Sequence, residues 1–595
     1  MAGRAPTRAP ERLKVLRLLR RYWRYYSLGS LTLVLVNLCD TALPLLLKVA
    51  IDDIVLARGL LPLWFVAALY LGLVLLLGVF RYFWRYYFIG ASYRITNETR
   101  ATLFAHLERL SASYFQKQRT GDIMSRATND LEAVRFFFAI GLLLALDTTM
   151  YLLIIPPAMV ALAPRLSLYT LVPLVVIPFF VIRMGRLVHS RFRRVQERFG
   201  SLASTVEETV GGVRVVKGFA QEEWRRQQFL TLNEDYLREN MQLQVTQGLF
   251  QPAIAFCMAV TMLIVIVSGG RMAIAGTITV GAFVAFQHYL LKLAWPMRAV
   301  GITVNLFQRG LASMERVDEI LATEPEIRDS QEALHAQGSQ AGRVERGELT
   351  IENLTFHYPG AVVPALHCAD LRVRPGETVA LVGPVGAGKS TLLKLIPRLF
   401  EAPSGTIRID GLDVRALPLA RLREAIGYVP QETFLFAETV GGNVAFSMPN
   451  ASLDEIRDAA QRAAILSEIE GIPSGFDAML GERGINLSGG QRQRVAIARA
   501  LIGKPRILLL DDCLSAVDTE TEAAILKGLT HNREARTTLI ASHRLTAIQN
   551  ADRIVCLDRG RIVEVGTHKE LLTKAGLYRM LWERQQLKEA LEDTL

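Results

Sequence analysis

Cysteine is scarce in this sequence and is not grouped. The 595 residues include only five cysteines, and no two of them have the spacing of a disulfide framework or of a zinc site. We therefore expect reduced thiols and contact with a reducing cytoplasm. The five residues are Cys39, Cys257, Cys368, Cys513 and Cys556.

Acidic residues are fewer than basic ones, so the formal net charge is +11. Such a surplus can indicate nucleic-acid binding. In the first half of the chain, however, Lys and Arg flank apolar stretches, where their retention on the cytoplasmic side of a membrane explains them. We therefore expect no nucleic-acid partner.

The N-terminal segment is basic, and no signal-peptide cleavage pattern precedes the first apolar stretch. Leu13, Leu16 and Leu19 recur at helical spacing among basic residues, and an aromatic group follows from Tyr22. This pattern is typical of an amphipathic helix in the membrane interface, to which we assign residues 1–26. A cleaved organellar transit segment is the alternative, because the segment is rich in Arg and poor in acids.

Apolar residues are abundant and make up 51% of the chain. Several stretches in the first half approach the roughly 20 residues that a helix needs to cross a bilayer, whereas the second half has the pattern of a soluble α/β domain. The chain is also too long for one compact core. We expect a transmembrane domain at 27–320, a linker at 321–345, an α/β domain at 346–580 and a helical tail at 581–595.

Six membrane-spanning helices are predicted in the transmembrane domain. The connections after the second and fourth spans are rich in Lys and Arg, so by the positive-inside rule they are cytoplasmic, as are both termini. Each has roughly fifty residues of helical character and, at about 1.5 Å per residue, should project well beyond the lipid. The predicted spans are 28–54, 60–82, 136–162, 166–186, 247–269 and 277–300. This topology predicts a multi-pass protein of the plasma (bacterial inner) membrane.

Several predicted spans contain polar or charged residues, which cost free energy in a bilayer unless they have a partner or face water. Each of them either pairs with a neighbouring helix or contacts a substrate or a gate. We favour pairing for any single residue. The residues are Asp40, Lys48, Asp147, Gln287, His288 and Lys292.

A glycine-rich loop follows a short apolar run and precedes a helical pattern at 392–400. In a strand–loop–helix of this kind, backbone N–H groups and the helix N-terminus hold phosphates, Lys389 meets the β and γ phosphates, and the Ser390 hydroxyl ligates Mg²⁺. The sequence therefore predicts an ATP site with Mg²⁺. The loop consists of Gly383, Pro384, Val385, Gly386, Ala387, Gly388, Lys389, Ser390 and Thr391.

Two further apolar runs predict strands that end in polar residues. The run 506–510 leads to Asp511, whose carboxylate is placed to hold Mg²⁺. The run 537–541 leads to Ser542 and His543, which puts an imidazole at the same edge of the sheet. We favour a γ-phosphate sensor for this histidine, with a purely structural role as the alternative.

The order and spacing of these motifs resemble the ATP-binding cassette (ABC) transporter family, and the six-span half resembles its exporter branch. The motif Leu487–Gln491 resembles the family signature, which reaches across a dimer to close on ATP held by the partner's phosphate loop. The resemblance implies an α-helical six-span transmembrane domain followed by an α/β P-loop domain with a helical subdomain. It also implies an ATPase that needs a second half-transporter.

The resemblance implies individual roles as well. Tyr358 resembles the aromatic residue that stacks on adenine, and Gln431 resembles the glutamine that contacts Mg²⁺ and the attacking water. Asp518 resembles the loop that signals between the two sites. In the membrane half, Thr120–Arg126 resembles the first coupling helix, and the second is expected near Phe219–Trp224. The signature residues expected to contact ATP are Ser488, Gly489, Gly490 and Gln491.

The residue after Asp511 departs from the family pattern, which has Glu there as the base or positioner of the attacking water. Asp512 keeps the charge, but its side chain is shorter by one carbon, about 1.5 Å, and a misplacement of about 1 Å can cost on the order of a hundredfold in rate. We expect this loop to bind ATP well and hydrolyse it slowly, unless a backbone adjustment lets Asp512 do the same work. The intact signature beside it resembles heterodimeric exporters in which such a half completes a competent site on its partner.

The implied function is ATP-driven export of amphipathic or hydrophobic substrates, which include small molecules, peptides and membrane lipid. Lipid flipping, a regulatory half that holds ATP as a structural clamp, and a homodimeric assembly are the alternatives. Uptake is disfavoured because the order of spans before cassette resembles exporters.

Overall fold

The structure is a computed structural model that describes residues 11–592, except 57–61, 332, 334–342, 482–483, 485, 531–535 and 546–547. Four expectations fall partly outside these residues: the start of the interfacial helix at 1–26, the start of the second span at 60–82, much of the linker at 321–345, and the end of the tail at 581–595.

The chain folds into two compact units, each described by itself. The first comprises the residues up to Glu108 and Thr120–Thr323, and the second comprises Arg109–Arg119 and the residues from Glu324. The excursion Arg109–Arg119 contains helix α4 (Ala112–Lys117), where the Ser113 hydroxyl donates to Glu326 at 2.5 Å. This contact holds the excursion within the second unit.

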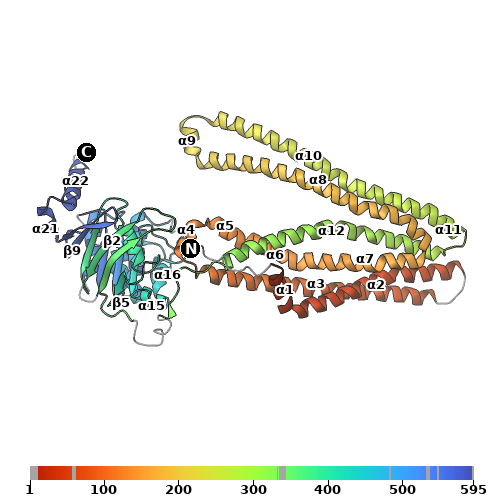
Figure 1. Ribbon diagram of the computed structural model, residues 1–595, viewed down its shortest axis with the longest axis horizontal. Helices are drawn as coiled ribbons and strands as arrows, with labels where there is room; N and C mark the ends of the chain where they lie inside the picture. The colour runs from red at the N-terminus through yellow and green to blue at the C-terminus, as the bar shows by residue number, and fades with distance from the viewer. Residues whose placement is uncertain are drawn as a thin grey trace. The chain divides into compact units, whose positions relative to one another are not determined.

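The first unit is helical (Figure 1). The helix pair α8 and α10 lies side by side, with α9 at the turn between them, and α2, α3, α7 and α12 pack against one another. The helices are α1 (Glu11–Arg21), α2 (Trp23–Val55), α3 (Leu63–Leu107), α5 (Thr120–Ser125), α6 (Leu131–Phe136), α7 (Leu142–Leu162), α8 (Pro164–Gly211), α9 (Val213–Gly218), α10 (Glu222–Ile264), α11 (Gly270–Ile274) and α12 (Val280–Leu321). Single π-helical turns are η1 (Arg126–Asp130), η2 (Phe137–Gly141) and η3 (Val265–Gly269).

Four stretches of the described chain are long and apolar enough to cross a membrane. They are Trp23–Val55, Leu63–Leu107, Thr120–Leu162 and Ala255–Ile274. They coincide with the first, second, third and fifth predicted spans. The fourth and sixth predicted spans lie in α8 and α12, helices of 48 and 42 residues. Helix α3 has 45 residues and is therefore about 68 Å long, which exceeds a bilayer core of about 30 Å.

The short helices expected to couple the two halves are only partly where the sequence places them. The segment Thr120–Ser125 is helical, as α5. The second short helix, α9, ends at Gly218, before the predicted region Phe219–Trp224. Ala220, at a positive φ of 51°, separates α9 from α10, so the predicted region, which directly follows α9, holds a turn and the start of α10 at Glu222.

Two glycines of α12 allow close helix packing. A Cβ on Gly281 would collide with the Lys48 carbonyl oxygen of α2, and one on Gly310 would collide with Phe137. The start of α12 is also fixed to the end of α2, because Asp52 accepts hydrogen bonds from the Thr279 hydroxyl and the Gly281 amide, both at 2.8 Å. Asp52 therefore serves to cap α12, a role that the sequence pattern did not indicate.

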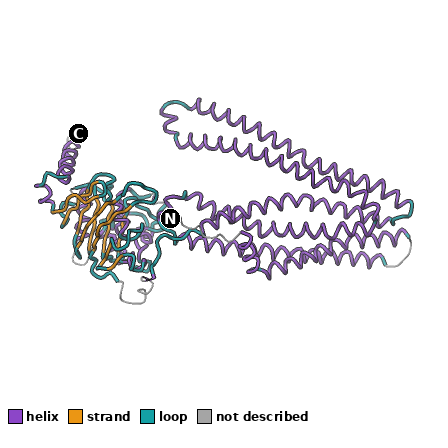
Figure 2. Tube along the Cα trace, in the orientation of Figure 1, coloured by secondary structure: helices purple, strands orange, loops and turns teal. Residues whose placement is uncertain are grey.

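The second unit contains two sheets, seen in Figure 2 as the only strands among the described residues. One is antiparallel with the order β2-β1-β4-β5, and the other has the order β10-β9-β3-β8-β7-β6 and is parallel from β9 to β6. The strands are β1 (Leu349–Phe356), β2 (Leu366–Val373), β3 (Thr378–Val382), β4 (Ile407–Ile409), β5 (Leu412–Asp413), β6 (Ile426–Val429), β7 (Ile507–Asp511), β8 (Thr537–Ala541), β9 (Arg553–Asp558) and β10 (Arg561–Gly566).

The parallel sheet lies between two hydrophobic cores. Along β3, Val379 and Leu381 face the core shared with β1 and β2, whereas Ala380 and Val382 face the core shared with the helices. This alternation is the period-2 pattern of a strand buried on both faces. The helices are α14 (Lys389–Leu395), α15 (Leu419–Glu424), α16 (Val440–Val444), α17 (Leu453–Arg462), α18 (Leu466–Gly471), α19 (Gly489–Ile502), α20 (Thr519–Thr530), α21 (His568–Thr573) and α22 (Leu577–Glu592), and η4 (Ala445–Ser447) and η5 (Gly475–Asp477) are 3₁₀ turns.

The helix after the phosphate loop is shorter than its predicted extent to residue 400. It ends at Leu395, because Pro397 has no backbone N–H to continue it and Arg398 has a positive φ of 51°. The predicted α/β domain with a helical subdomain is otherwise confirmed, and β3, β7 and β8 end at the same edge of the sheet.

Candidate functional site

The loop after β3 is shaped by glycines. A Cβ on Gly383 would collide with the Leu557 carbonyl oxygen, and one on Gly388 would lie 2.7 Å from the Ala365 carbonyl oxygen. Gly386 and Gly388 also have positive φ values of 81° and 102°, which L side chains rarely adopt. Val385 is 90% exposed at the tip of the loop. Glycine at these three positions therefore permits the compact turn between strand and helix.

Lys389, the first residue of α14, is turned into the loop. Its ammonium group donates to the carbonyl oxygens of Gly383 at 2.7 Å and Pro384 at 3.0 Å, and the residue is only 7% exposed. Burial lowers the pKa of Lys389, and the nearby carboxylates of Asp512 and Asp511 oppose that shift. The cation is thus held at the centre of the loop, where phosphate oxygens would compete with these two carbonyls.

Asp511 ends β7 and is 1% exposed. The Ser390 hydroxyl donates to its Oδ1 at 2.7 Å, while Oδ2 is buried without a hydrogen-bond partner. Burial raises the pKa of Asp511, and the Ser390 hydrogen bond opposes the shift. A buried carboxylate with one free oxygen beside a hydroxyl fits Mg²⁺, which takes few protein ligands and completes its shell with water and phosphate. Among the described residues, no cluster of three His, Cys, Asp or Glu side chains could hold a metal alone.

Asp512 and His543 meet at the same edge of the sheet. Asp512 has a positive φ of 47°, and its amide donates to the Ala541 carbonyl oxygen at 2.9 Å. Its Oδ1 accepts a long hydrogen bond of 3.4 Å from the His543 amide, and the His543 side chain is exposed. The Asp512 carboxylate is therefore directed towards the histidine loop.

Tyr358 and Gln431 also lie in this unit. The Tyr358 hydroxyl is 3.2 Å from the Thr391 hydroxyl, and its ring packs edge-on against Phe356 and Phe400. This places an aromatic ring next to the phosphate-loop helix. Gln431 is exposed just after β6, and no hydrogen bond ties it to the Asp511 carboxylate among the described residues.

The signature residues begin α19. Ser488 caps the helix by accepting from the Gln491 amide, and the Gln491 side chain accepts from the Ser488 amide, which makes a capping box. A Cβ on Gly490 would lie 2.8 Å from the Ala516 carbonyl oxygen. No hydrogen bond in the described chain joins the signature to the phosphate loop, so the structure does not bring these two predicted parts together.

Sequence reasoning missed the residues that support this helix. Glu468 on α18 accepts from the Gln491 side chain at 2.9 Å and pairs with Arg494 at 2.6 Å. Burial opposes ionisation of Glu468, but these two hydrogen bonds outweigh it and lower the pKa of this carboxyl. Glu468, an ionised acid on the neighbouring helix α18, therefore holds the start of α19 in place. The sequence pattern did not indicate this contact, because it depends on how α18 and α19 pack.

The loop between Asp512 and Asp518 is held from two sides. Gln493 of α19 donates to the Ser515 hydroxyl at 3.3 Å and accepts from the Ala516 amide at 3.1 Å. Arg544, next to His543, donates to the carbonyl oxygens of Val517 at 2.7 Å and Ser515 at 3.2 Å. The signature helix and the histidine loop therefore share one connecting loop. Asp518 ends this loop and accepts from the Thr521 amide of α20 at 2.9 Å.

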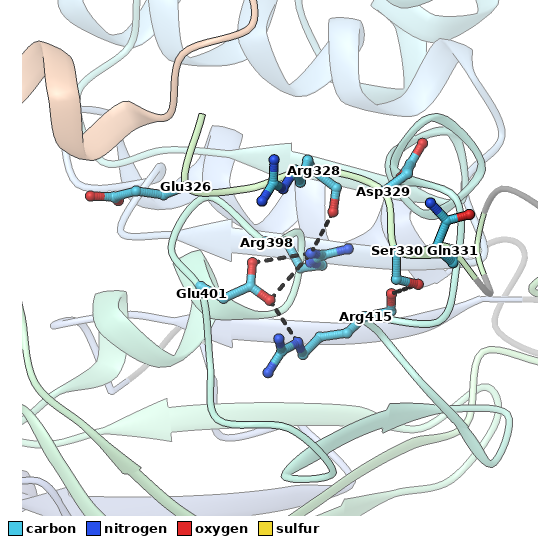
Figure 3. Close-up of a pocket in the computed structure, with 8 residues that line it drawn as sticks. All are labelled: Glu326, Arg328, Asp329, Ser330, Gln331, Arg398, Glu401 and Arg415. Carbon is cyan, nitrogen blue, oxygen red and sulfur yellow. Dashed lines mark hydrogen bonds and ion pairs between the residues drawn. The ribbon is translucent and has the colours of Figure 1, made fainter. Parts of the chain in front are cut away.

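A separate cavity of about 740 Å³ lies where the chain enters the second unit (Figure 3). Arg398 is at its centre and donates to the Arg328 carbonyl oxygen and to both oxygens of Glu401, which also pairs with Arg415 at 3.0 Å. The Ser330 hydroxyl donates to the Arg415 carbonyl oxygen at 3.1 Å. Arg398, Glu401 and Arg415 pair with one another and also bond the chain at Arg328 and Ser330, so these residues anchor that chain segment.

We expect Glu401→Gln to destabilise the second unit by roughly 2 kcal/mol, because it leaves the nearly buried Arg398 charge without its counter-ion. Denaturant unfolding of the full chain, with ATP binding in native buffer as a check on folding, measures this. Glu424→Gln is the matched control, since Glu424 is exposed on α15. Equal shifts of the unfolding midpoint for both variants would contradict the anchoring role.

Comparisons with known proteins agree with this geometry. The family model "ABC transporter transmembrane region" matches residues 27–297, and the model "ABC transporter" matches residues 366–515. The chain is 37% identical to the probable multidrug resistance ABC transporter ATP-binding/permease protein YheI of Bacillus subtilis (strain 168), with 96% of each chain covered. It is 35% identical to an ATP-dependent lipid A-core flippase of Thiobacillus denitrificans (strain ATCC 25259 / T1), over 97% of this chain and 98% of the relative.

A solved structure shows the same fold over nearly the whole chain. It is a bacterial Atm1-family ABC exporter with ATP bound, which superposes with a TM-score of 0.76 at 29% identity and covers 95% of this chain and 98% of its own. A helical transmembrane domain therefore precedes an ATP-binding domain, and transport is coupled to ATP hydrolysis. The chain belongs to the ABC transporter family and is a multi-pass membrane protein of the half-transporter type.

Proposed function

We propose that this chain is one half of an ATP-driven exporter of amphipathic or hydrophobic substrates, with a slow ATP site of its own. Slow hydrolysis at this site is inferred from Asp512, whose short side chain accepts a hydrogen bond from the His543 amide at 3.4 Å. A carboxylate engaged with the protein backbone and one carbon shorter than Glu is poorly placed to reach an attacking water. The site therefore favours holding ATP over hydrolysing it.

Each residue of the site would bind a different part of ATP or its metal ion. Lys389 would exchange its two carbonyl partners for β and γ phosphate oxygens, and the loop amides from Gly383 would surround the phosphates. Ser390 and Asp511 would hold Mg²⁺ together with Gln431, and the metal neutralises charge on the phosphates when bound. Tyr358 would stack on the adenine.

The chemical step is the attack of water on the γ phosphorus. A bond forms between the water oxygen and phosphorus, the bond to the bridging β–γ oxygen breaks, and ADP and phosphate leave. Asp512 would orient the water and take up its proton, and His543 would contact the γ phosphate from the neighbouring strand end. Slow turnover follows if Asp512 does not reach the water.

A second half-transporter completes the sites in this proposal. Ser488 is exposed at the start of α19, and no hydrogen bond joins the signature to the chain's own phosphate loop among the described residues. We propose a heterodimer, in which the partner has Glu at the position equivalent to Asp512 and this chain's signature closes on the partner's ATP. A homodimer is the alternative, and the absence of a neighbouring reading frame for such a partner would favour it.

The test is the ATPase activity of the purified complex with one site altered at a time. Lys389→Ala is expected to weaken ATP binding at this chain's site by at least tenfold, because the only buried ammonium of the loop is lost. Removing the partner's glutamate is expected to abolish nearly all turnover. Lys504→Ala, an exposed lysine of the same unit, is the control.

The outcomes separate the alternatives. Loss of turnover on removal of the partner's glutamate, with slow residual hydrolysis that Lys389→Ala then removes, supports the slow site. Equal contributions from the two sites contradict it. If Lys389→Ala stops transport but leaves the partner's hydrolysis unchanged, this chain acts as a regulatory half that holds ATP as a clamp.

Lipid flipping is the second candidate, because one relative with 35% identity over 97% of the chain is an ATP-dependent lipid A-core flippase. Transport into inverted vesicles, which requires both termini to be cytoplasmic as we propose, would be measured for drug, peptide and lipid substrates in parallel. ATP-dependent movement of labelled lipid without movement of the drugs or peptides would favour the flippase.

A further inference from the structure

Asp40 on α2 and Asp147 on α7 are acidic residues within predicted membrane spans, and of these two only Asp40 forms ion pairs in the described chain, with Lys292 and Arg81. Asp40 on α2 pairs with Lys292 on α12 at 2.7 Å, and the Lys292 ammonium also donates to the Asp40 carbonyl oxygen at 2.5 Å. Tyr151 on α7 donates to the same carboxylate at 2.9 Å. The interhelical pairing favoured from the sequence is therefore confirmed for Asp40 and Lys292.

Asp147 on α7 differs from Asp40. Its hydrogen-bond partner is neutral, because the Asn37 amide nitrogen donates to Oδ1 at 3.1 Å. Within the described chain, no Lys, Arg or His forms an ion pair with Asp147, although the residue is half-buried. An unpaired carboxylate in a membrane span is costly and calls for a ligand or a partner.

A second polar group beside Asp147 also lacks its hydrogen bond. Asn37 is 1% exposed, and its amide nitrogen is satisfied by the Leu33 carbonyl oxygen and by Asp147. Its amide oxygen, Oδ1, is buried and has no donor within the described chain. The hydroxyl of Thr148, the residue after Asp147, is buried without a partner as well. The Asn37 amide oxygen thus lacks a hydrogen-bond donor, and the neighbouring Asp147 carboxylate lacks an ion pair, among the described residues.

These observations define the chemical group that a ligand must bring to Asp147 and Asn37. It must supply a hydrogen-bond donor to Asn37 Oδ1 and a positive charge to Asp147, and a protonated primary amine does both with its three N–H bonds. A divalent metal is a poorer fit, because the described residues contain no cluster of three His, Cys, Asp or Glu side chains. Val36 and Leu144, within one helical turn of Asn37 and Asp147, are buried and apolar. These neighbours make the environment of the two polar residues apolar, and we therefore expect an aliphatic chain on the amine.

We propose that Asp147 and Asn37 form a binding site for the ammonium group of a cationic amphiphile, which α2 and α7 hold between them. The two helices pack against each other and against α12 (Figure 1). This inference rests on the proposed export function and deepens it by naming a substrate class. Asp147 supplies the charge, and Asn37 supplies the second acceptor.

The test is equilibrium binding of radiolabelled dodecylamine, which is charged at pH 7, and of dodecanol, its neutral counterpart. The full-length protein would be placed in phosphatidylcholine nanodiscs, and binding to empty discs would be subtracted. We expect the wild type to bind the amine about tenfold more tightly than the alcohol. Asp147→Asn should remove this preference, because the shape and the acceptor for Asn37 remain while the charge is lost.

Three controls make the result specific. Asp147→Glu should keep a preference for the amine, and Asp122→Asn, which removes an exposed acid of α5, should leave it unchanged. Unchanged dodecanol affinity in Asp147→Asn shows that the variant is folded. If Asp147→Asn retains the tenfold preference for the amine, or Asp122→Asn loses it, the proposed binding site is refuted.

Export and amine binding are measured in separate experiments, so that either proposal can be refuted without the other. ATP-dependent accumulation of the labelled amine in inverted vesicles reports export. A preference that depends on Asp147, without any accumulation, would refute the proposed export function and leave a cation site. Accumulation of the amine at equal rates in wild type and Asp147→Asn, with equal affinities, would refute the site and leave the export function.

Discussion

Asp512→Glu is expected to raise ATP hydrolysis at this chain's own site by one to two orders of magnitude. The substitution adds one carbon, about 1.5 Å, and a gain of about 1 Å in the position of a catalytic group corresponds to on the order of a hundredfold in rate. The change also frees the carboxylate from its long hydrogen bond with the His543 amide. Phosphate release is the measurement, with the partner's own catalytic residue removed so that only this site turns over.

The affinity for ATP should change little in this variant, because Lys389 and Ser390 are untouched. Asp454→Glu, an exposed acid in the first turn of α17, is the matched control for the added carbon. An unchanged rate would mean that the backbone at Asp512, with its φ of 47°, already brings the shorter side chain to the water. A lower rate would mean that its contact with His543 is needed for catalysis. Either result contradicts the slow site as we propose it.

Gly490→Val is expected to lower turnover at the partner's site by about a hundredfold or more. A Cβ at this position already lies 2.8 Å from the Ala516 carbonyl oxygen, and valine adds two methyl groups to it. Gln493 and Arg544 hold the loop that contains Ala516, so that loop cannot move away without breaking their hydrogen bonds. The start of α19 must therefore shift, and a shift of about 1 Å is enough for this loss.

The effect of Gly490→Val should appear across the dimer and not at this chain's own phosphate loop. ATP binding at Lys389 is expected to stay within about threefold of wild type, which a nucleotide-binding titration of the complex measures. Gly503→Ala, at the other end of α19, is the control, because a Cβ there lies at an ordinary 3.7 Å from the Ser447 hydroxyl. Full activity of Gly490→Val in the complex would show that the signature does not act on the partner's ATP.

Much of the second unit could be predicted because its motifs are local. The spacing of glycines, Lys389 and Ser390 encodes a strand, a turn and a helix within a few residues, and the structure shows β3, the loop and α14 in that order. Asp511 and His543 could be placed at one edge because parallel strands end together. The end of α14 at Leu395 was missed, since the helical pattern continues beyond Pro397 although the helix does not.

The residues that hold the site in place could not be predicted in the same way. Glu468 and Gln491 are 23 residues apart, and Arg544 and Val517 are 27 residues apart. No periodic pattern connects such pairs, because their contact depends on how α18, α19 and the strand ends pack. The capping role of Asp52 on α12, across 229 residues, is of the same kind.

The sequence by itself determined the class of the protein, which has apolar membrane spans followed by a phosphate-binding loop. Both features depend on residues that are consecutive in the chain, so they can be recognised without the fold. Tertiary structure alone decided which charges are paired. It joined Asp40 to Lys292 across 252 residues and left Asp147 with a neutral hydrogen-bond partner. It also turned the Asp512 carboxylate towards His543. The physical reason is that hydrogen bonds and close ion pairs form only when two groups approach within about 3 to 4 Å. They are therefore set by the packing of distant helices and strands and not by their order in the chain.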